Sequence, residues 1–159
     1  MMKDLSILDS LITGRVEPHI YAFTTNTIPN YLKVGDTYRP VSKRLSEWRE
    51  YFPNLEQKFE GSARITDDVY FRDFAVHDFL EFEKHRVRLE ASDLPEGVYY
   101  SKEFFKEATV GDVEEAIADI HDDYESKSGR YHYGSIRTGY LCCDFLCYRI
   151  DTVKMAGKF

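Results

Sequence analysis

Residues 19–35 of the chain read HIYAFTTNTIPNYLKVG. The stretch from His19 to Thr24 alternates along the chain and is rich in aromatic and β-branched side chains, which predicts a β-strand. The polar loop that follows contains Pro29 between two asparagines, and Tyr31–Gly35 then predicts a second short strand. Two such strands joined by a short loop are expected to pair as an antiparallel hairpin.

Helical periodicity follows the hairpin. Pro40 suits the first turn of a helix, and apolar residues recur at helical spacing from Val41, so a helix is predicted to run to about Phe52. The other predicted elements are a strand within residues 55–65, a helix over residues 69–85 capped by Asp67 or Asp68, a short strand at residues 98–100, and a helix over residues 111–125 capped by Thr109 or Asp112.

These elements predict an α+β fold in which a three-stranded antiparallel sheet is flanked by helices. Residues 1–17 form an amphipathic lead-in, residues 18–107 the central domain, and residues 108–159 an acidic helix with a C-terminal extension packed on the same domain. Residues 140–153 are apolar and fit a helix and a strand equally well. Residues 142–150 within this segment suit a core or an interface, so the oligomeric state stays open.

The composition is typical of one folded domain in water, with 159 residues, 43% hydrophobic and 31% charged. No apolar run approaches the roughly 20 residues that a membrane span needs, and the N-terminus has no signal-peptide pattern, so no membrane partner is expected. Cys142, Cys143 and Cys147 lie close together without a CxxC pair. This favours reduced thiols and a cytoplasmic protein.

Charge is unevenly distributed along the chain, whose net charge is −7. Residues 111–125 are acidic and contain no lysine or arginine, whereas residues 33–49 and 84–88 are basic. The two basic segments would face a polyanion if the acidic helix faced away from them. From charge alone, ordinary solvated surfaces are the favoured alternative.

Common catalytic signatures are missing from the sequence, including the phosphate-binding loop, GxGxxG, HExxH and GxSxG. What remains is a series of polar residues near the ends of the predicted elements: Tyr21, Lys33, Arg44, His77 and Glu103. Phosphodiester hydrolysis needs a base for water, a cation for the developing charge and an acidic metal ligand, and this series contains all three.

The order and spacing of the series resemble the GIY-YIG nuclease superfamily. The matching motifs are His19-Ile20-Tyr21, Lys33-Val34-Gly35, Pro40-Val41-x-x-Arg44, Phe71-Arg72-Asp73-x-x-Val76-His77-x-x-Leu80 and Glu103-Phe104-Phe105. The fourth motif resembles the branch in which the nuclease domain precedes a helicase or restriction-type module. The resemblance covers about residues 18–107 and implies a small GIY-YIG-like nuclease domain there. It departs from the family at His19, which replaces a Gly, at Lys33, which replaces a Tyr, and at Asp36, where some relatives have a His.

The resemblance implies a role for each residue of the series. Tyr21 would be the general base, helped by the Lys33 ammonium, since an unperturbed phenol is protonated near neutral pH. Arg44 would hold the scissile phosphate, and His77 would orient a phosphate or assist proton transfer. Glu103 would bind Mg²⁺, with Mn²⁺ as a second candidate. Each residue also has a structural alternative. Tyr21 would be a half-buried sheet aromatic, Lys33 a solvated edge lysine, and Arg44 the partner of Glu47 in an ion pair. His77 would occupy a core position, and Glu103 would be a carboxylate at a helix N-terminus. Arg72 and Asp73 are expected to form a structural pair.

Further residues are expected to contact the DNA backbone without reading its sequence. They are Gly35, which would allow close approach of the phosphate, Arg39, Lys43, Arg49, Lys84, Arg86 and Arg88. Tyr99 and Tyr100 are candidates for stacking on bases, with a position in the core or at its rim as the favoured alternative.

Three functions stay in competition. The first is a Mg²⁺-dependent endonuclease acting on DNA, and the resemblance adds a helicase or restriction-type protein as a partner. The second is a catalytically inactive module with the same fold that binds nucleic acid or a partner. The third is an interaction domain without a nucleic-acid partner, in line with a pI near 5.2.

Overall fold

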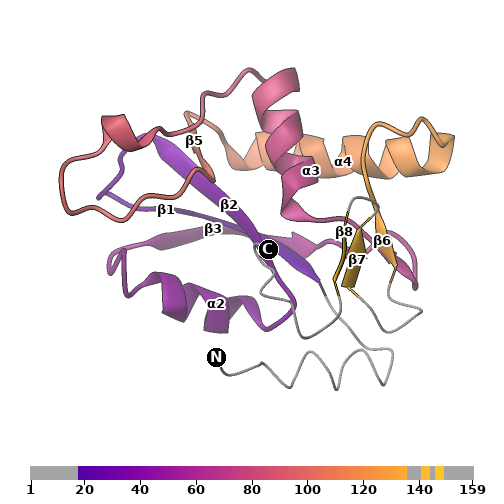
Figure 1. The fold of residues 1–159 in the computed structure, drawn as a ribbon, viewed down its shortest axis with the longest axis horizontal. Helices are drawn as coiled ribbons and strands as arrows, with labels where there is room; N and C mark the ends of the chain where they lie inside the picture. Colours follow the sequence, from indigo (N-terminus) through magenta and orange to yellow (C-terminus); the bar gives the residue numbers. More distant parts are fainter. Residues whose placement is uncertain (1–17, 136–140, 144–145, 149–159) are drawn as a thin grey trace.

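The hairpin predicted from residues 19–35 forms the centre of the main sheet in the computed structural model, which describes residues 18–135, 141–143 and 146–148. β1 (His19–Thr24) pairs antiparallel with β2 (Tyr31–Thr37), and β3 (Glu56–Ser62) pairs with the other edge of β1. A fourth strand, β5 (Phe104–Lys106), pairs with β2, so the strand order is β3-β1-β2-β5 (Figure 1). The prediction of three strands was therefore incomplete, because three residues are too few to show an alternating pattern.

A second, smaller sheet joins distant parts of the chain. β4 (Val69–Tyr70) pairs with β6 (Gly134–Ser135), followed in order by β7 (Leu141–Cys143) and β8 (Leu146–Tyr148). The described parts of the apolar segment 140–153 are thus strands rather than a helix. The strand predicted at residues 98–100 is wrong, since these residues have no regular secondary structure.

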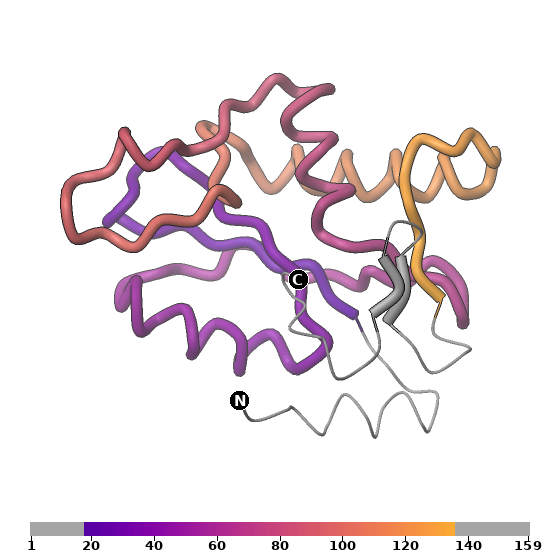
Figure 2. Tube along the Cα trace, in the orientation of Figure 1, coloured from indigo at the N-terminus to yellow at the C-terminus, as the bar shows by residue number. Residues whose placement is uncertain are grey.

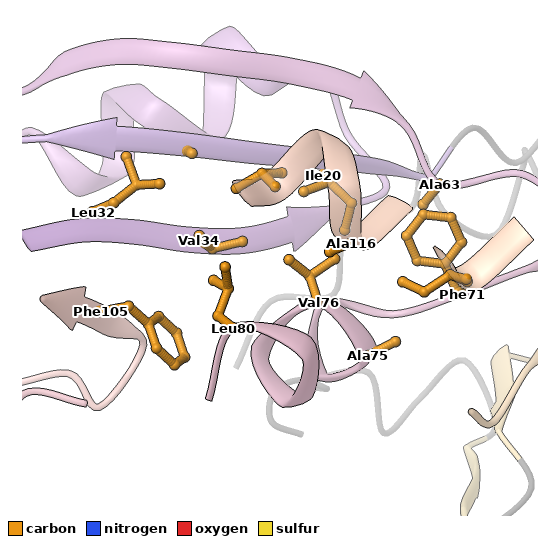
Figure 3. Packing of buried hydrophobic residues seen from close by; sticks show 13 residues of the cluster. Ile20, Leu32, Val34, Ala63, Phe71, Ala75, Val76, Leu80, Phe105 and Ala116 are labelled. Carbon is orange, nitrogen blue, oxygen red and sulfur yellow. The ribbon is translucent and has the colours of Figure 1, made fainter. Parts of the chain in front are cut away.

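Helices cover both faces of the main sheet, because β1 and β2 send alternate side chains to opposite faces. α2 (Val41–Trp48) lies on one face, and α3 (Asp73–Asp78) and α4 (Val110–Ser126) lie on the other (Figure 1). The buried residues on the α3 and α4 face include Ile20, Leu32, Val34, Phe71, Val76, Leu80, Phe105 and Ala116 (Figure 3). Those on the α2 face include Tyr21, Phe23, Leu45, Trp48, Phe52 and Phe104.

Two helices differ from their predicted bounds. α2 ends at Trp48 rather than Phe52, and the chain leaves it in a turn. The helix predicted from residue 69 starts only at Asp73, because β4 occupies the first part of the segment and pairs with distant β6. Its N-cap is Arg72, so the predicted caps Asp67 and Asp68 are wrong. Beyond α3 the chain forms a π-helical turn, η1 (Phe79–Glu83), which brings the helical segment close to its predicted end.

α4 agrees with the predicted acidic helix, and Thr109 is its N-cap. The Thr109 Oγ1 accepts a hydrogen bond from the Asp112 backbone N–H at 3.1 Å, and an Asp112 carboxylate oxygen accepts from the Thr109 N–H at 3.1 Å. The same carboxylate binds the Arg86 guanidinium at 2.9 Å, and Glu115 binds the Lys84 ammonium at 2.8 Å. The condition that the acidic helix faces away from the basic segments is therefore not met for residues 84–88, because opposite charges from the two segments pair directly.

Some predictions fall on residues outside the described part of the chain. This group contains the lead-in 1–17, most of the C-terminal extension and the side chains of the three cysteines. The packing of the two segments and the redox state of the cysteines therefore stay predictions. None of the described helices combines the length and the apolar character needed to cross a bilayer.

Removing the side-chain cap of α4 tests the account of this helix. We expect Thr109→Ala to lower the free energy of unfolding by about 1 kcal/mol, because the Asp112 N–H loses its acceptor. Urea denaturation followed by circular dichroism measures this difference. Thr109→Ser keeps a hydroxyl and should stay within about 0.5 kcal/mol of the parent. An equal loss in both variants would contradict the capping role.

Candidate active site

The candidate site lies at the edge of β2, where β5 stops pairing with it. β5 pairs with β2 as far as Lys33, and the next residue, Val34, donates its backbone N–H to the Glu103 carbonyl at 3.1 Å. The Val34 carbonyl accepts a hydrogen bond from His77 Nε2 of α3 at 2.8 Å. One backbone position of β2 therefore anchors both Glu103, from the loop before β5, and His77, from the helix layer.

A buried ammonium links the strands at this edge. Lys33 is only 1% exposed, and its Nζ lies 3.3 Å from Tyr21 Oη and 2.7 Å from Glu103 Oε1. The Trp48 ring lies beneath the same ammonium, 4.2 Å from Nζ to ring centroid. Burial lowers the pKa of Lys33, but the charge of Glu103 and the neighbouring Tyr21 raise it, and the net direction is upward. Lys33 is therefore charged, and the alternative of a solvated edge lysine is wrong.

Tyr21 lies deeper than a half-buried sheet aromatic. The residue is 1% exposed, and its hydroxyl oxygen accepts hydrogen bonds from Trp48 Nε1 at 2.7 Å and from Lys33 at 3.3 Å. Both donors occupy lone-pair positions of this oxygen. At 1% exposure, Tyr21 lies behind the side chains that surround its hydroxyl.

Gly35 supplies the space for this pair of side chains. It lies opposite Tyr21 across the hairpin, and a Cβ at Gly35 would lie 2.6 Å from Tyr21 Oη and 2.7 Å from Lys33 Nζ. The close approach that Gly35 permits is thus an approach of the protein's own polar groups. The resemblance implied an approach of the phosphate instead.

Arg44 reaches the same cluster from α2. Its side chain is 35% exposed and binds Glu47 Oε1 at 2.8 Å. The ion pair with Glu47, which the sequence suggested as the structural alternative for Arg44, is therefore formed. Its guanidinium also lies 5.2 Å from the Trp48 ring centroid. Burial lowers the pKa of Arg44, whereas Tyr21 and then Glu47 raise it, and the net direction is upward. Arg44 is therefore a fixed positive charge beside the Tyr21 hydroxyl.

A possible set of metal ligands lies on the α3 side of Glu103. One ligand atom from each of Asp73, His77 and Glu103 lies within 4.8 Å of the other two. Asp73 was expected to pair with Arg72, but Arg72 binds Asp36 Oδ2 at 2.8 Å instead. The spacing of Asp73 and His77, one helical turn apart, is the sequence signal that would have placed both on one face of a helix.

The triad contains two carboxyl groups and one imidazole. Burial, followed by the charges of Asp36 and Glu103, raises the pKa of Asp73 well above its usual range. Burial lowers the pKa of His77 to about 4, so the imidazole is neutral, and its Nε2–H donates to Val34 while Nδ1 keeps a lone pair. Two carboxylates and a neutral imidazole are ligands of the types that Mg²⁺ and Mn²⁺ accept.

The cationic side chains among the predicted DNA contacts fall into two groups. Lys43 and Arg49 are exposed on α2 and at its end. The other cations are in ion pairs: Arg39 with Glu47, Lys84 and Arg86 with α4, and Arg88 with Glu81. Arg86 and Arg88 also line a groove of about 570 Å³ together with Tyr100 and Lys102. Much of the basic charge in segment 84–88 is therefore offset within the protein.

Comparisons of the chain with protein-family models, with curated proteins and with solved structures gave no match in any of the three.

Adding one methyl group at Gly35 tests the close packing of the cluster. We expect Gly35→Ala to lower the free energy of unfolding by about 1–3 kcal/mol, because the new Cβ overlaps Tyr21 and Lys33. Gly111→Ala is the matched control, since its Cβ meets only Thr109 Oγ1 at 3.6 Å. That variant should be as stable as the parent or more stable. Equal stability of Gly35→Ala and the parent in urea denaturation would contradict the packing described here.

The raised pKa of Asp73 predicts a pH-dependent effect of its removal. The folded state holds this proton more tightly than the unfolded state, so the contribution of Asp73 to stability is lost as pH rises above about 4. In EDTA, Asp73→Asn should match the wild type near this pH and become progressively more stable than it as pH rises. The depressed pKa of His77 acts in the opposite direction, with stability lost as pH falls from about 6.5 toward 4, but it is common to both proteins and cancels in the difference.

Thermal unfolding at several pH values measures this difference. Adding Mn²⁺ at neutral pH should raise the melting temperature of the wild type and leave that of Asp73→Asn unchanged. A difference between the two proteins that does not vary with pH would contradict the assigned direction of the Asp73 pKa.

Proposed function

We propose that this protein is a metal-dependent endonuclease that hydrolyses phosphodiester bonds in DNA. The observation that carries the proposal is the meeting of Tyr21, Lys33 and Glu103. Lys33 and Glu103 are 70 positions apart in the sequence, yet Lys33 Nζ lies 2.7 Å from Glu103 Oε1. A phenol, two cations and a carboxylate gathered at one sheet edge are the groups that this reaction needs.

Each group has a defined task in the proposal. Asp73, His77 and Glu103 would hold a divalent metal, which supplies Lewis-acid stabilisation of the phosphate charge when bound. Arg44 stabilises the negative charge that develops on the phosphate oxygens. Tyr21 accepts the proton of the attacking water, and Lys33 and Trp48 stabilise the negative charge on its oxygen.

The side chains of the cluster differ in their exposure to solvent. The side chains of Glu103 and Arg44 are 34% and 35% exposed, so both reach solvent and a substrate. Tyr21 and Lys33 lie behind them at 1% exposure each. Catalysis by Tyr21 therefore requires its hydroxyl to exchange one of its present donors for water.

The resemblance to GIY-YIG nucleases supports the same assignment. The Tyr-bearing strand, the second strand, the Arg-bearing helix and the Glu-Phe-Phe motif occur in the expected order, and their polar residues converge. The resemblance also supports a helicase or restriction-type protein as a partner. Mg²⁺ is the metal proposed first, and the imidazole of His77 makes Mn²⁺ a good second candidate.

A second function is favoured by the burial of Tyr21. A buried phenol that accepts hydrogen bonds from Trp48 and Lys33 also fits a tyrosine with a purely structural role. In that case the cluster would stabilise the domain and take no part in catalysis. The protein would in that case be a catalytically inactive module that binds nucleic acid or a partner.

Cleavage of supercoiled plasmid separates these two functions. The protein should nick or cut the plasmid in Mg²⁺ or Mn²⁺ and be inactive in EDTA. Glu103→Gln and Tyr21→Phe should each lose at least about two orders of magnitude in rate. Tyr31→Phe and Glu107→Gln are matched controls outside the cluster and should retain the parental rate. Salt-dependent DNA binding without cleavage in any metal would favour the inactive module, and parental activity of both cluster variants would contradict the proposed site.

A further inference from the structure

Two exposed tyrosines stack on each other beside the candidate site. Tyr51, just after α2, and Tyr99, in the loop before β5, have ring centroids 4.0 Å apart and an interplanar angle of 24°. They are 51% and 44% exposed, and the Tyr99 ring contacts Trp48 and Phe52, so Tyr99 lies at the rim of the core. Figure 2 traces the loop before β5, and the ring contact joins this loop to the turn after α2. We call Tyr51 and Tyr99 the tyrosine platform.

The platform is continuous with the site through Trp48. The centroid of the Trp48 ring lies 6.2 Å from that of Tyr51 and 6.0 Å from that of Tyr99. The indole N–H of the same residue donates to Tyr21 Oη at 2.7 Å, and its ring lies under the Lys33 ammonium. One tryptophan therefore joins the buried cluster to exposed aromatic rings.

Exposed charged residues of both signs lie close to the platform in the sequence. Arg49 and Glu50 precede Tyr51, and Lys102 follows Tyr99 by three positions. Lys102 lines the groove that also contains Arg86 and Arg88. The platform itself offers exposed aromatic faces, which suit stacking on a flat ring.

We propose that the tyrosine platform stacks an unpaired nucleobase of the nucleic-acid strand that is bound at the site. This inference rests on the proposed nuclease function and specifies its substrate as single-stranded, frayed or otherwise unpaired at the nucleotide next to the cleaved bond. Bases inside a duplex already stack on their neighbours and offer no free face, whereas an unpaired base does. The platform would hold that base, and the exposed Arg49, two residues before Tyr51, would contact an adjacent phosphate.

The test measures binding in EDTA, so that it does not depend on cleavage. Fluorescence anisotropy compares three probes of equal length: a single-stranded oligonucleotide, the same strand with abasic positions, and a blunt duplex. The wild type should bind the first probe more tightly than the other two. Tyr51→Ala and Tyr99→Ala should each weaken that binding by about 5-fold to 100-fold, the range expected for one base–aromatic stack.

Matched variants separate stacking from folding. Tyr51→Phe and Tyr99→Phe keep the rings and should bind like the wild type. Phe82→Ala removes an aromatic ring that is 64% exposed on η1, at the opposite face of the sheet, and should also bind like the wild type. Thermal unfolding of every variant confirms that each is folded at the assay temperature.

The outcomes distinguish this inference from the proposed function. Equal binding of the alanine variants and the wild type, or equal binding of the abasic and intact strands, overturns the stacking role. If either of these results is found and the wild type still cleaves plasmid, the stacking role is overturned and the nuclease proposal stands. A loss of self-association in Tyr51→Ala or Tyr99→Ala, without a change in oligonucleotide binding, would assign the platform to a second copy of the chain and also overturns the inference.

Discussion

The burial of the Lys33 ammonium is the constraint on which the rest of the site depends. A charge removed from water costs several kcal/mol unless partners replace its hydration. At 1% exposure, Lys33 has a carboxylate at 2.7 Å, a hydroxyl at 3.3 Å and an indole ring beneath it. Gly35 belongs to the same arrangement, because any larger residue would occupy the volume of the ammonium and the phenol. The cluster therefore folds as a unit in which each member needs the others.

Glu103 connects this cluster to the opposite face of the sheet. Its carboxylate binds Lys33 and also lies within 4.8 Å of ligand atoms of Asp73 and His77. Any cation held by the triad shares that carboxylate with the ammonium, so metal binding and the environment of Tyr21 are electrostatically linked.

The net charge of −7 does not describe the local charges on the surface, because oppositely charged segments of the chain pair with each other. Asp112 caps α4 and binds Arg86, and Glu115 binds Lys84, so the acidic helix and the basic segment partly neutralise each other. The cations that remain exposed near the candidate site, Lys43, Arg49 and Lys102, are few. The proposed nuclease would therefore hold nucleic acid through a small number of local contacts rather than through a broad positive surface.

The sequence by itself determined the elements whose pattern is local. Alternation in residues 19–35 specified the central hairpin, and helical periodicity specified α2 and α4. The order of Tyr21, Lys33, Arg44 and Glu103 selected residues that the structure brings together, and the nuclease chemistry inferred from them stays a prediction. Only the tertiary structure decided the features that depend on long-range pairing. These are the fourth strand β5, the pairing of β4 with β6, the partner of Arg72, the place of Asp73 beside Glu103 and the burial of Tyr21. The physical reason is that short strands and single charged residues carry almost no local signal, and their partners are selected by packing across distant parts of the chain.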